Sequence, residues 1–220
     1  MAFTMTHLII SYNTSGIFSD IITNLPPFYL GTIAPDAVHN RAGYVSDFKK
    51  ASHLITGTEK WGMVTDNDGW KDNVISFLHK HKDTEHRDFI LGYCSHILSD
   101  MYNNIKVWTP FRLKHDIELE KGYGNIHHQE SYKIDTELAL MYENRGMFWH
   151  NLRKSNSIDF PDIIFADEMD KQKSNILNLW YKDIERPDLS SNKIRTLKGE
   201  LEFIKNATEY VAAFFRENLA

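Results

Sequence analysis

The sequence has only one cysteine, Cys94, among its 220 residues. A framework of internal disulfides and a cysteine-rich zinc module are therefore both excluded. Glycine and proline are scarce, with 11 and 6 residues, which excludes collagen-like and low-complexity chains. Apolar runs long enough to span a bilayer are lacking, and no lysine or arginine precedes Arg41. We therefore expect a cytoplasmic protein without a signal peptide or a transmembrane segment.

Basic residues are also too few for a surface that binds nucleic acid. The chain has 25 Lys and Arg against 30 Asp and Glu, a net charge of −5, whereas nucleic-acid-binding proteins usually have a basic excess. Hydrophobic residues make up 42% of the chain, enough for a core, and we expect residues 1–220 to form a single domain. Histidine, by contrast, is plentiful, with 11 residues, which points to histidine and carboxylate ligands if a metal is bound.

The periodicity of the apolar residues is helical. Spacings of three and four recur over residues 70–81, 88–104, 135–143, 176–184 and 197–215. Because the strict alternation of a strand is hard to find, the sequence predicts an all-α fold. Proline predicts two interruptions: Pro26 and Pro27 should end the first helical segment, and residues 30–40 should form an ordered turn or loop. The lysine pair at positions 49 and 50 is expected to be exposed.

Two residues on the predicted helix 88–104 have the spacing of metal ligands. His96 and Asp100 are four residues apart, so their side chains lie on one helix face within reach of one ion. An imidazole with a carboxylate suits zinc, manganese or iron. The spacing by itself is weak, because a surface or core ion pair also produces it. Asp36 presents a similar choice, since a carboxylate after Pro35 either caps a helix or offers a ligand from a stiff turn.

Three further histidines complete the set of candidates. His39 follows Asp36 by three residues and is expected to join the site or to orient a ligand from behind. His7 and His53 have apolar neighbours, and each alone is more simply a core residue.

Taken in order, these residues and the phrases around them resemble the zinc-dependent phospholipase C family, whose fold is shared with the P1-type nucleases. The matching phrases are Phe-Tyr-Leu-Gly-Thr-Ile-Ala-Pro-Asp at 28–36, Ser-His-Leu at 52–54 and Leu-Gly-Tyr-Cys-Ser-His-Ile-Leu-Ser-Asp at 91–100. The resemblance covers about the first half of the chain and looks like a short, intracellular branch of the family.

The resemblance implies a helical bundle with a zinc cluster at one end. One metal site would consist of Asp36, His53, His96 and Asp100, while Asp100 would bridge to a second metal that His7 also binds. Asp36 and Asp100 are then the expected catalytic residues. One or two zinc ions would activate water against the phosphorus of a phosphodiester or another phosphate ester, either a small molecule or a lipid.

The second half of the chain departs from the family pattern. Lys106 stands six residues after Asp100, where the family has histidine, and no His-x-x-x-Glu pair follows. A third metal is therefore not expected. The remaining downstream candidates are His115, His127, His128, Glu130 and Asp135, and for the last four a solvated loop is the alternative interpretation.

Two other functions remain open. An HD-type metal phosphohydrolase acting on nucleotides needs an adjacent His-Asp pair, and His115-Asp116 is the pair present. A non-catalytic helical binding protein that keeps a metal for stability is the second alternative, because structural metal sites use the same residue types. Cys94, among apolar helix residues, is expected to be an inert core thiol.

Overall fold

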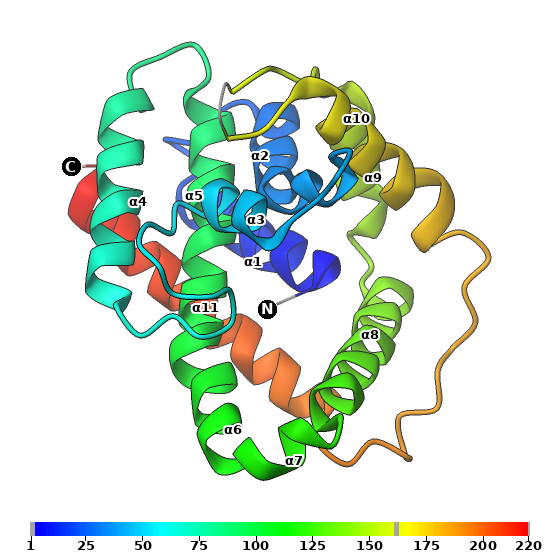
Figure 1. Ribbon diagram of the computed structural model, residues 1–220. Helices are drawn as coiled ribbons and strands as arrows, with labels where there is room; N and C mark the ends of the chain where they lie inside the picture. Colours follow the sequence, from blue (N-terminus) through cyan, green and yellow to red (C-terminus); the bar gives the residue numbers. More distant parts are fainter. Residues whose placement is uncertain (1–2, 161–162, 220) are drawn as a thin grey trace.

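The computed structural model describes residues 3–160 and 163–219, and these residues form helices without any strand (Figure 1). The all-α prediction is confirmed. The α-helices are α1 (Thr4–Ile17), α2 (Leu25–Ala37), α3 (Ser46–Ser52), α4 (Asn67–His81), α5 (Arg87–Asn103), α6 (Thr109–Lys114), α7 (Asp116–Glu120), α8 (Tyr123–Met141), α9 (Arg145–Lys154), α10 (Ala166–Asn175) and α11 (Leu197–Asn218). Three short helical turns, η1 (Val38–Asn40), η2 (Asn104–Trp108) and η3 (Ile176–Trp180), extend α2, α5 and α10.

Helix α5 is the central element of the fold. In Figure 1 it runs between α4 on one side and α1 and α2 on the other, and α11 crosses the bundle beside it. Almost every residue of α5 is buried. Because it is surrounded by other helices, its polar residues His96, Ser99 and Asp100 must find partners inside the protein.

Two glycines set the close approach of α2 and α5. A Cβ atom on Gly31 would lie 2.0 Å from the carbonyl oxygen of Phe89, and one on Gly92 would lie 1.9 Å from that of Phe28. Neither position has room for a side chain unless the backbones separate. This contact brings the last turn of α2, which carries Asp36, toward the face of α5 that carries His96.

The strongest periodic segments form helices as predicted: residues 70–81 lie in α4, residues 88–104 match α5 within a residue, and residues 197–215 lie in α11. Residues 135–143 form the end of α8, which stops at Met141, whereas only the first half of 176–184 is helical, in η3. None of the helices in the described ranges combines the length and apolar character that crossing a bilayer requires.

The two predictions based on proline are wrong. Pro26 and Pro27 lie in the first turn of α2 instead of ending a helix, because the N–H groups of a first helical turn have no partner within the helix. Residues 30–40 are helical as well, and Pro35 lies within the last turn of α2. The apolar side chains from Phe28 to Ala34 are buried on all sides, so packing against α5 outweighs the local preference for a turn.

Candidate metal centre

The structure brings together the five residues predicted as ligands. His7 comes from α1, Asp36 from the end of α2, His53 from the residue after α3, and His96 and Asp100 from α5. The Nε2 atom of His53 lies 3.6 Å from Oδ1 of Asp36, 3.4 Å from Oδ2 of Asp100 and 3.3 Å from Nε2 of His96. On the other side of Asp100, its Oδ1 atom lies 3.5 Å from Nε2 of His7.

These residues form two overlapping groups that share His96. His7, His96 and Asp100 make the first group, and Asp36, His53 and His96 make the second. Within each group the ligand atoms lie within 4.8 Å of one another. Bonds of about 2 Å from a tetrahedral zinc would place its ligand atoms roughly 3.3 Å apart. The spacing therefore fits one small divalent cation per group after slight contraction.

Each of the three histidines is held from behind through its Nδ1 atom. The partner of His96 is the carbonyl oxygen of Thr32 at 2.7 Å, and that of His53 is the carbonyl oxygen of Lys49 at 2.9 Å. A carbonyl oxygen only accepts, so both Nδ1 atoms carry the proton and both Nε2 lone pairs face the cluster. This is the arrangement that proteins use to orient imidazoles that bind a metal.

His7 shows the same arrangement with a hydroxyl as partner. Its Nδ1 atom lies 3.0 Å from Oγ of Ser99, and its ring stacks on that of His96 with centroids 3.7 Å apart. Among the described residues, no group completes a hydrogen bond with the buried Nε2 atom of His7. A buried nitrogen left without such a bond is costly, and a cation at this position would satisfy it.

The electrostatics favour neutral imidazoles and ionised carboxylates. Burial lowers the pKa of both His53 and His96, so these rings are neutral at pH 7. Burial alone would raise the pKa of Asp100, but the neighbouring imidazoles of His53 and His7 hold it well below its usual range. Burial of Asp36 is likewise outweighed by the positive charge of Lys49, so the pKa of Asp36 is also lowered. These are the protonation states in which such residues bind metal.

Lys49 is the residue of this region that the sequence did not reveal. Its side chain was expected to be exposed, but only 1% of it is accessible. Its Nζ atom lies 2.6 Å from Oδ1 of Asp36 and 3.0 Å from Nε2 of His39. His39, which is 3.9 Å from Asp36, thus adjoins the cluster as expected, but it does so largely through Lys49. A lysine that directly precedes another lysine gives no sequence signal for burial.

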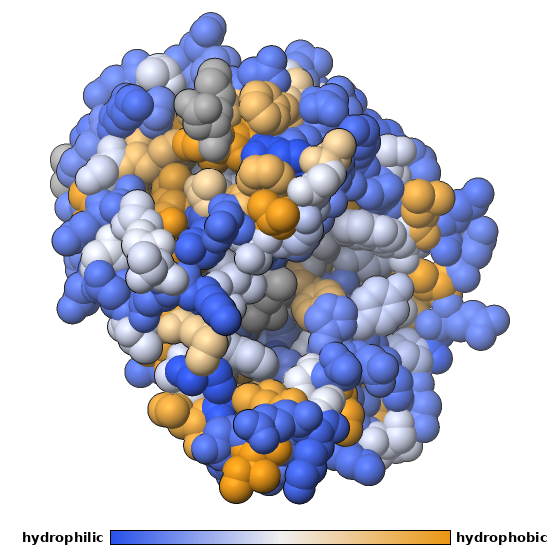
Figure 2. Space-filling model, viewed as in Figure 1, coloured by the Kyte–Doolittle hydropathy of each residue, from blue (hydrophilic) through white to orange (hydrophobic). Residues whose placement is uncertain are grey.

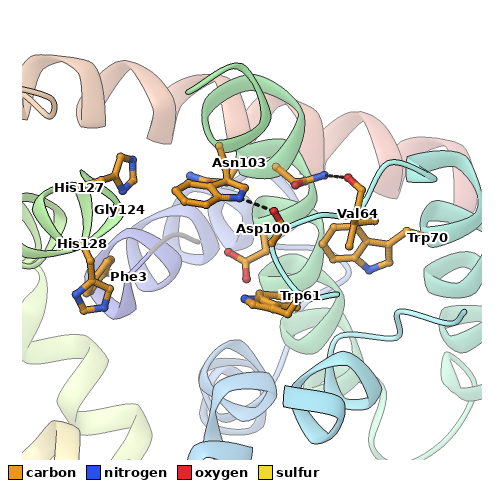
Figure 3. Close-up of a pocket in the computed structure, with 12 residues that line it drawn as sticks. Phe3, Trp61, Val64, Trp70, Asp100, Asn103, Gly124, His127 and His128 are labelled. Atoms are coloured by element: carbon orange, nitrogen blue, oxygen red, sulfur yellow. Dashed lines mark hydrogen bonds between the residues drawn. The ribbon is translucent and has the colours of Figure 1, made fainter. Parts of the chain in front are cut away.

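Two cavities lie beside the cluster. The first, of about 260 Å³, has Asp100 in its wall together with Trp61, Trp70 and Trp108. Figure 3 shows Asp100 near Trp61, with Phe3, His127 and His128 across the space. The second cavity, of about 400 Å³, has Asp36, His39 and Asp135 in its wall. Phe3 and His128 line both cavities, and Figure 2 shows this face of the molecule hollowed near its middle.

Four of the five downstream candidates lie on α8 and so are not in a solvated loop. Glu130 accepts backbone N–H bonds from residues 193, 194 and 195, and so fixes the segment before α11. Asp135 accepts the N–H of Met5 and the hydroxyl of Tyr181. Neither acid belongs to a potential metal group within the described part of the chain.

The downstream histidines also stand apart from the two groups. His127 and His128 line the first cavity, and the ring of His127 packs against those of Trp108 and Phe111. His115 lies beyond α6, packs against Phe111 and pairs with Glu118 at 3.6 Å. The second half of the chain therefore supplies a wall for the cavities and leaves the five ligands to the first half.

Comparisons of the chain with protein-family models, with curated proteins and with solved structures found no match. The function is therefore inferred from the chemistry of the cluster and its two cavities.

Proposed function

We propose that this protein is a zinc-dependent hydrolase of phosphoric esters, of the phospholipase C type. The observation that carries the proposal is the cluster itself: three imidazoles, each held at Nδ1, turn their Nε2 atoms toward two ionised carboxylates. Histidine nitrogen and carboxylate oxygen are ligands that zinc prefers, and the overlap of two groups suits a pair of ions.

Bound zinc would supply the two contributions that ester hydrolysis needs, a water of lowered pKa and positive charge beside the phosphoryl oxygens. The protein's own residues would supply position. Asp100 lies within 4 Å of all three histidines, which suits a carboxylate between two ions. The side chain of Asp36, at 20% accessible, is the most exposed of the five, so a water in the second cavity can reach it.

The first cavity favours a phosphodiester with an apolar or aromatic group. Its described wall combines three tryptophans with Phe3 and Val64 and includes no lysine or arginine. Such a wall stabilises an uncharged organic group next to the cluster, whereas additional phosphates would lack positive partners.

The HD-type nucleotide hydrolase receives less support. Its required pair, His115 and Asp116, lies at the junction of α6 and α7, where the Asp116 carboxylate accepts the N–H of Ile117. The His115 side chain already pairs with Glu118 and packs against the ring of Phe111. Hydrolysis of nucleotides without hydrolysis of diesters would nevertheless favour this alternative.

The test combines metal analysis with turnover. Protein stripped with a chelator and reloaded with zinc should retain one or two ions and should hydrolyse bis(p-nitrophenyl) phosphate. His96→Ala should lose both properties, because His96 belongs to both groups. His150→Ala is the matched control, since His150 is exposed on α9 and should keep both. A wild-type protein that retains no zinc at saturating supply would refute the proposal.

A metal that only stabilises the fold is the second candidate. It is favoured by burial, since His7, His53 and His96 are each at most 1% accessible. This alternative predicts that a chelator lowers the melting temperature sharply while no ester is hydrolysed under any condition. Zinc-dependent turnover that is lost in His96→Ala would exclude it.

A further inference from the structure

Lys49 places a buried positive charge inside the candidate metal centre. Its ammonium contacts Oδ1 of Asp36 at 2.6 Å and lies 4.8 Å from the centre of the Trp61 ring. Burying an ammonium is costly unless a carboxylate or an aromatic face compensates it, and this one has both. These two contacts hold the positive charge at the Asp36 end of the cluster.

The ammonium of Lys49 contacts the carboxylate oxygen that Asp36 would offer to a metal ion. The Oδ1 atom of Asp36 that it contacts is also the oxygen that lies 3.6 Å from Nε2 of His53. The backbone of Lys49 also acts on the site, because its carbonyl accepts the Nδ1 proton of His53. One residue thus holds two members of the group formed by Asp36, His53 and His96.

The contact between Lys49 and Asp36 has a thermodynamic consequence. Without metal, removal of the ammonium would leave the partly buried Asp36 carboxylate without this positive partner, which destabilises the metal-free state. With metal bound, the ion itself compensates the charge of Asp36. Removal of the ammonium then also removes its repulsion of the ion, so the metal-bound state is destabilised less than the metal-free state. A change that destabilises the free state more than the bound state must increase the affinity.

We propose that Lys49 is a resident cation of this centre, which allows the site to fold empty and makes a divalent ion compete for Asp36. This inference rests on the proposed metal binding. It predicts that removal of the ammonium increases the affinity of the group that contains Asp36 for a divalent ion. Lys49 acts through Asp36 and is therefore a positioning residue.

The test is a zinc titration of chelator-stripped protein against a chromogenic competing chelator, with thermal unfolding of each sample. Lys49→Met, which keeps the length and removes the charge, should melt at a lower temperature without zinc. Its affinity for zinc at the group that contains Asp36 should increase by about tenfold or more. Lys50→Met is the matched control, because Lys50 pairs with Asp47 outside the cluster and should leave zinc affinity unchanged.

The outcomes separate this inference from the proposed function. If wild type binds no zinc, the proposed function fails. If wild type binds zinc but Lys49→Met binds it equally or less tightly, the proposed function stands and the role of Lys49 is refuted. Should Lys49→Met not fold without metal, it is refolded with zinc present: recovery of the fold supports the resident cation, and failure to recover overturns it.

Discussion

The cluster around α5 and the polar residues His127, Glu130 and Asp135 of α8 contain the same residue types, but only the cluster is a candidate metal site. Both carry histidine and acidic side chains on helices. In the cluster, the atoms left over after internal hydrogen bonding point toward one another. On α8, the oxygens of Glu130 already accept three backbone N–H groups. Residue type and burial are common to both regions, and the direction of the remaining lone pairs makes only one of them a candidate site.

Asp100 and Asp135 show the same contrast in their protonation. Both are 3% accessible. Asp100 has three imidazoles around it, and despite burial these neighbours hold its pKa well below the usual range. For Asp135, burial dominates and raises the pKa to about 7, although the hydroxyl of Tyr181 and the N–H of Met5 oppose it. The neighbours of a buried carboxyl, more than burial itself, decide whether it is available to a cation.

The largest expected effect breaks this contrast directly. Asp100→Asn should abolish zinc retention and turnover, because it removes a ligand that contacts all three histidines. The loss should exceed the roughly 10- to 100-fold loss typical of residues that only orient ligands. Asp135→Asn, the same change at equal burial, should keep zinc. Metal analysis and diester hydrolysis measure both, and equal zinc content in the two variants would contradict the contrast.

The next effect concerns the close backbone contact between α2 and α5, which positions the cluster and does not involve α8. Gly92→Ala should lower the free energy of unfolding by about 3 kcal/mol, because the new Cβ atom meets the Phe28 carbonyl oxygen at 1.9 Å. Gly146→Ala on α9 meets nothing within 4 Å and should be neutral or slightly stabilising. Urea unfolding of both variants provides the comparison, and a Gly92→Ala protein as stable as wild type would show that α2 and α5 are not in tight contact.

A smaller effect, visible through pH, sharpens the contrast between the two aspartates. Asp135 has a pKa of about 7 in the folded protein against 3.8 as its ordinary value, so the folded state holds a proton that the unfolded state releases. This contribution to stability is complete below about pH 4 and is lost as the pH rises through 7. The stability of wild type relative to Asp135→Asn should therefore fall by about 2–3 kcal/mol from pH 5 to pH 8. Thermal unfolding at both pH values measures it, and a constant difference would show that Asp135 is already ionised at pH 5.

The smallest effect tests the structural role of α8. Glu130→Gln should cost about 1 kcal/mol of unfolding free energy, because a neutral amide accepts N–H groups less strongly than a carboxylate. Zinc content should not change. Glu143→Gln, at an exposed position just beyond α8, is the control and should have no effect on either quantity. Loss of zinc in Glu130→Gln would instead connect α8 to the cluster.

The sequence predicted the candidate ligands better than it predicted the elements that carry them. His96 and Asp100 were placed correctly because helical spacing is a local property. Asp36 was expected in a loop, yet it lies in α2, since the tight contact with α5 stabilises a helix that its prolines do not forbid. Local preferences around Pro35 could not include that contact, because it joins residues about sixty positions apart.

The amino-acid sequence alone determined the helical class of the fold and the imidazole and carboxyl groups available for chemistry, because periodicity and side-chain type can be read within a few residues. Only the tertiary structure decided which of these groups face one another, that Lys49 is buried against Asp36, and that Asp135 serves the start of α1. These outcomes depend on which surfaces pack together and on the charges that meet there, and both are set by contacts between segments distant in the chain.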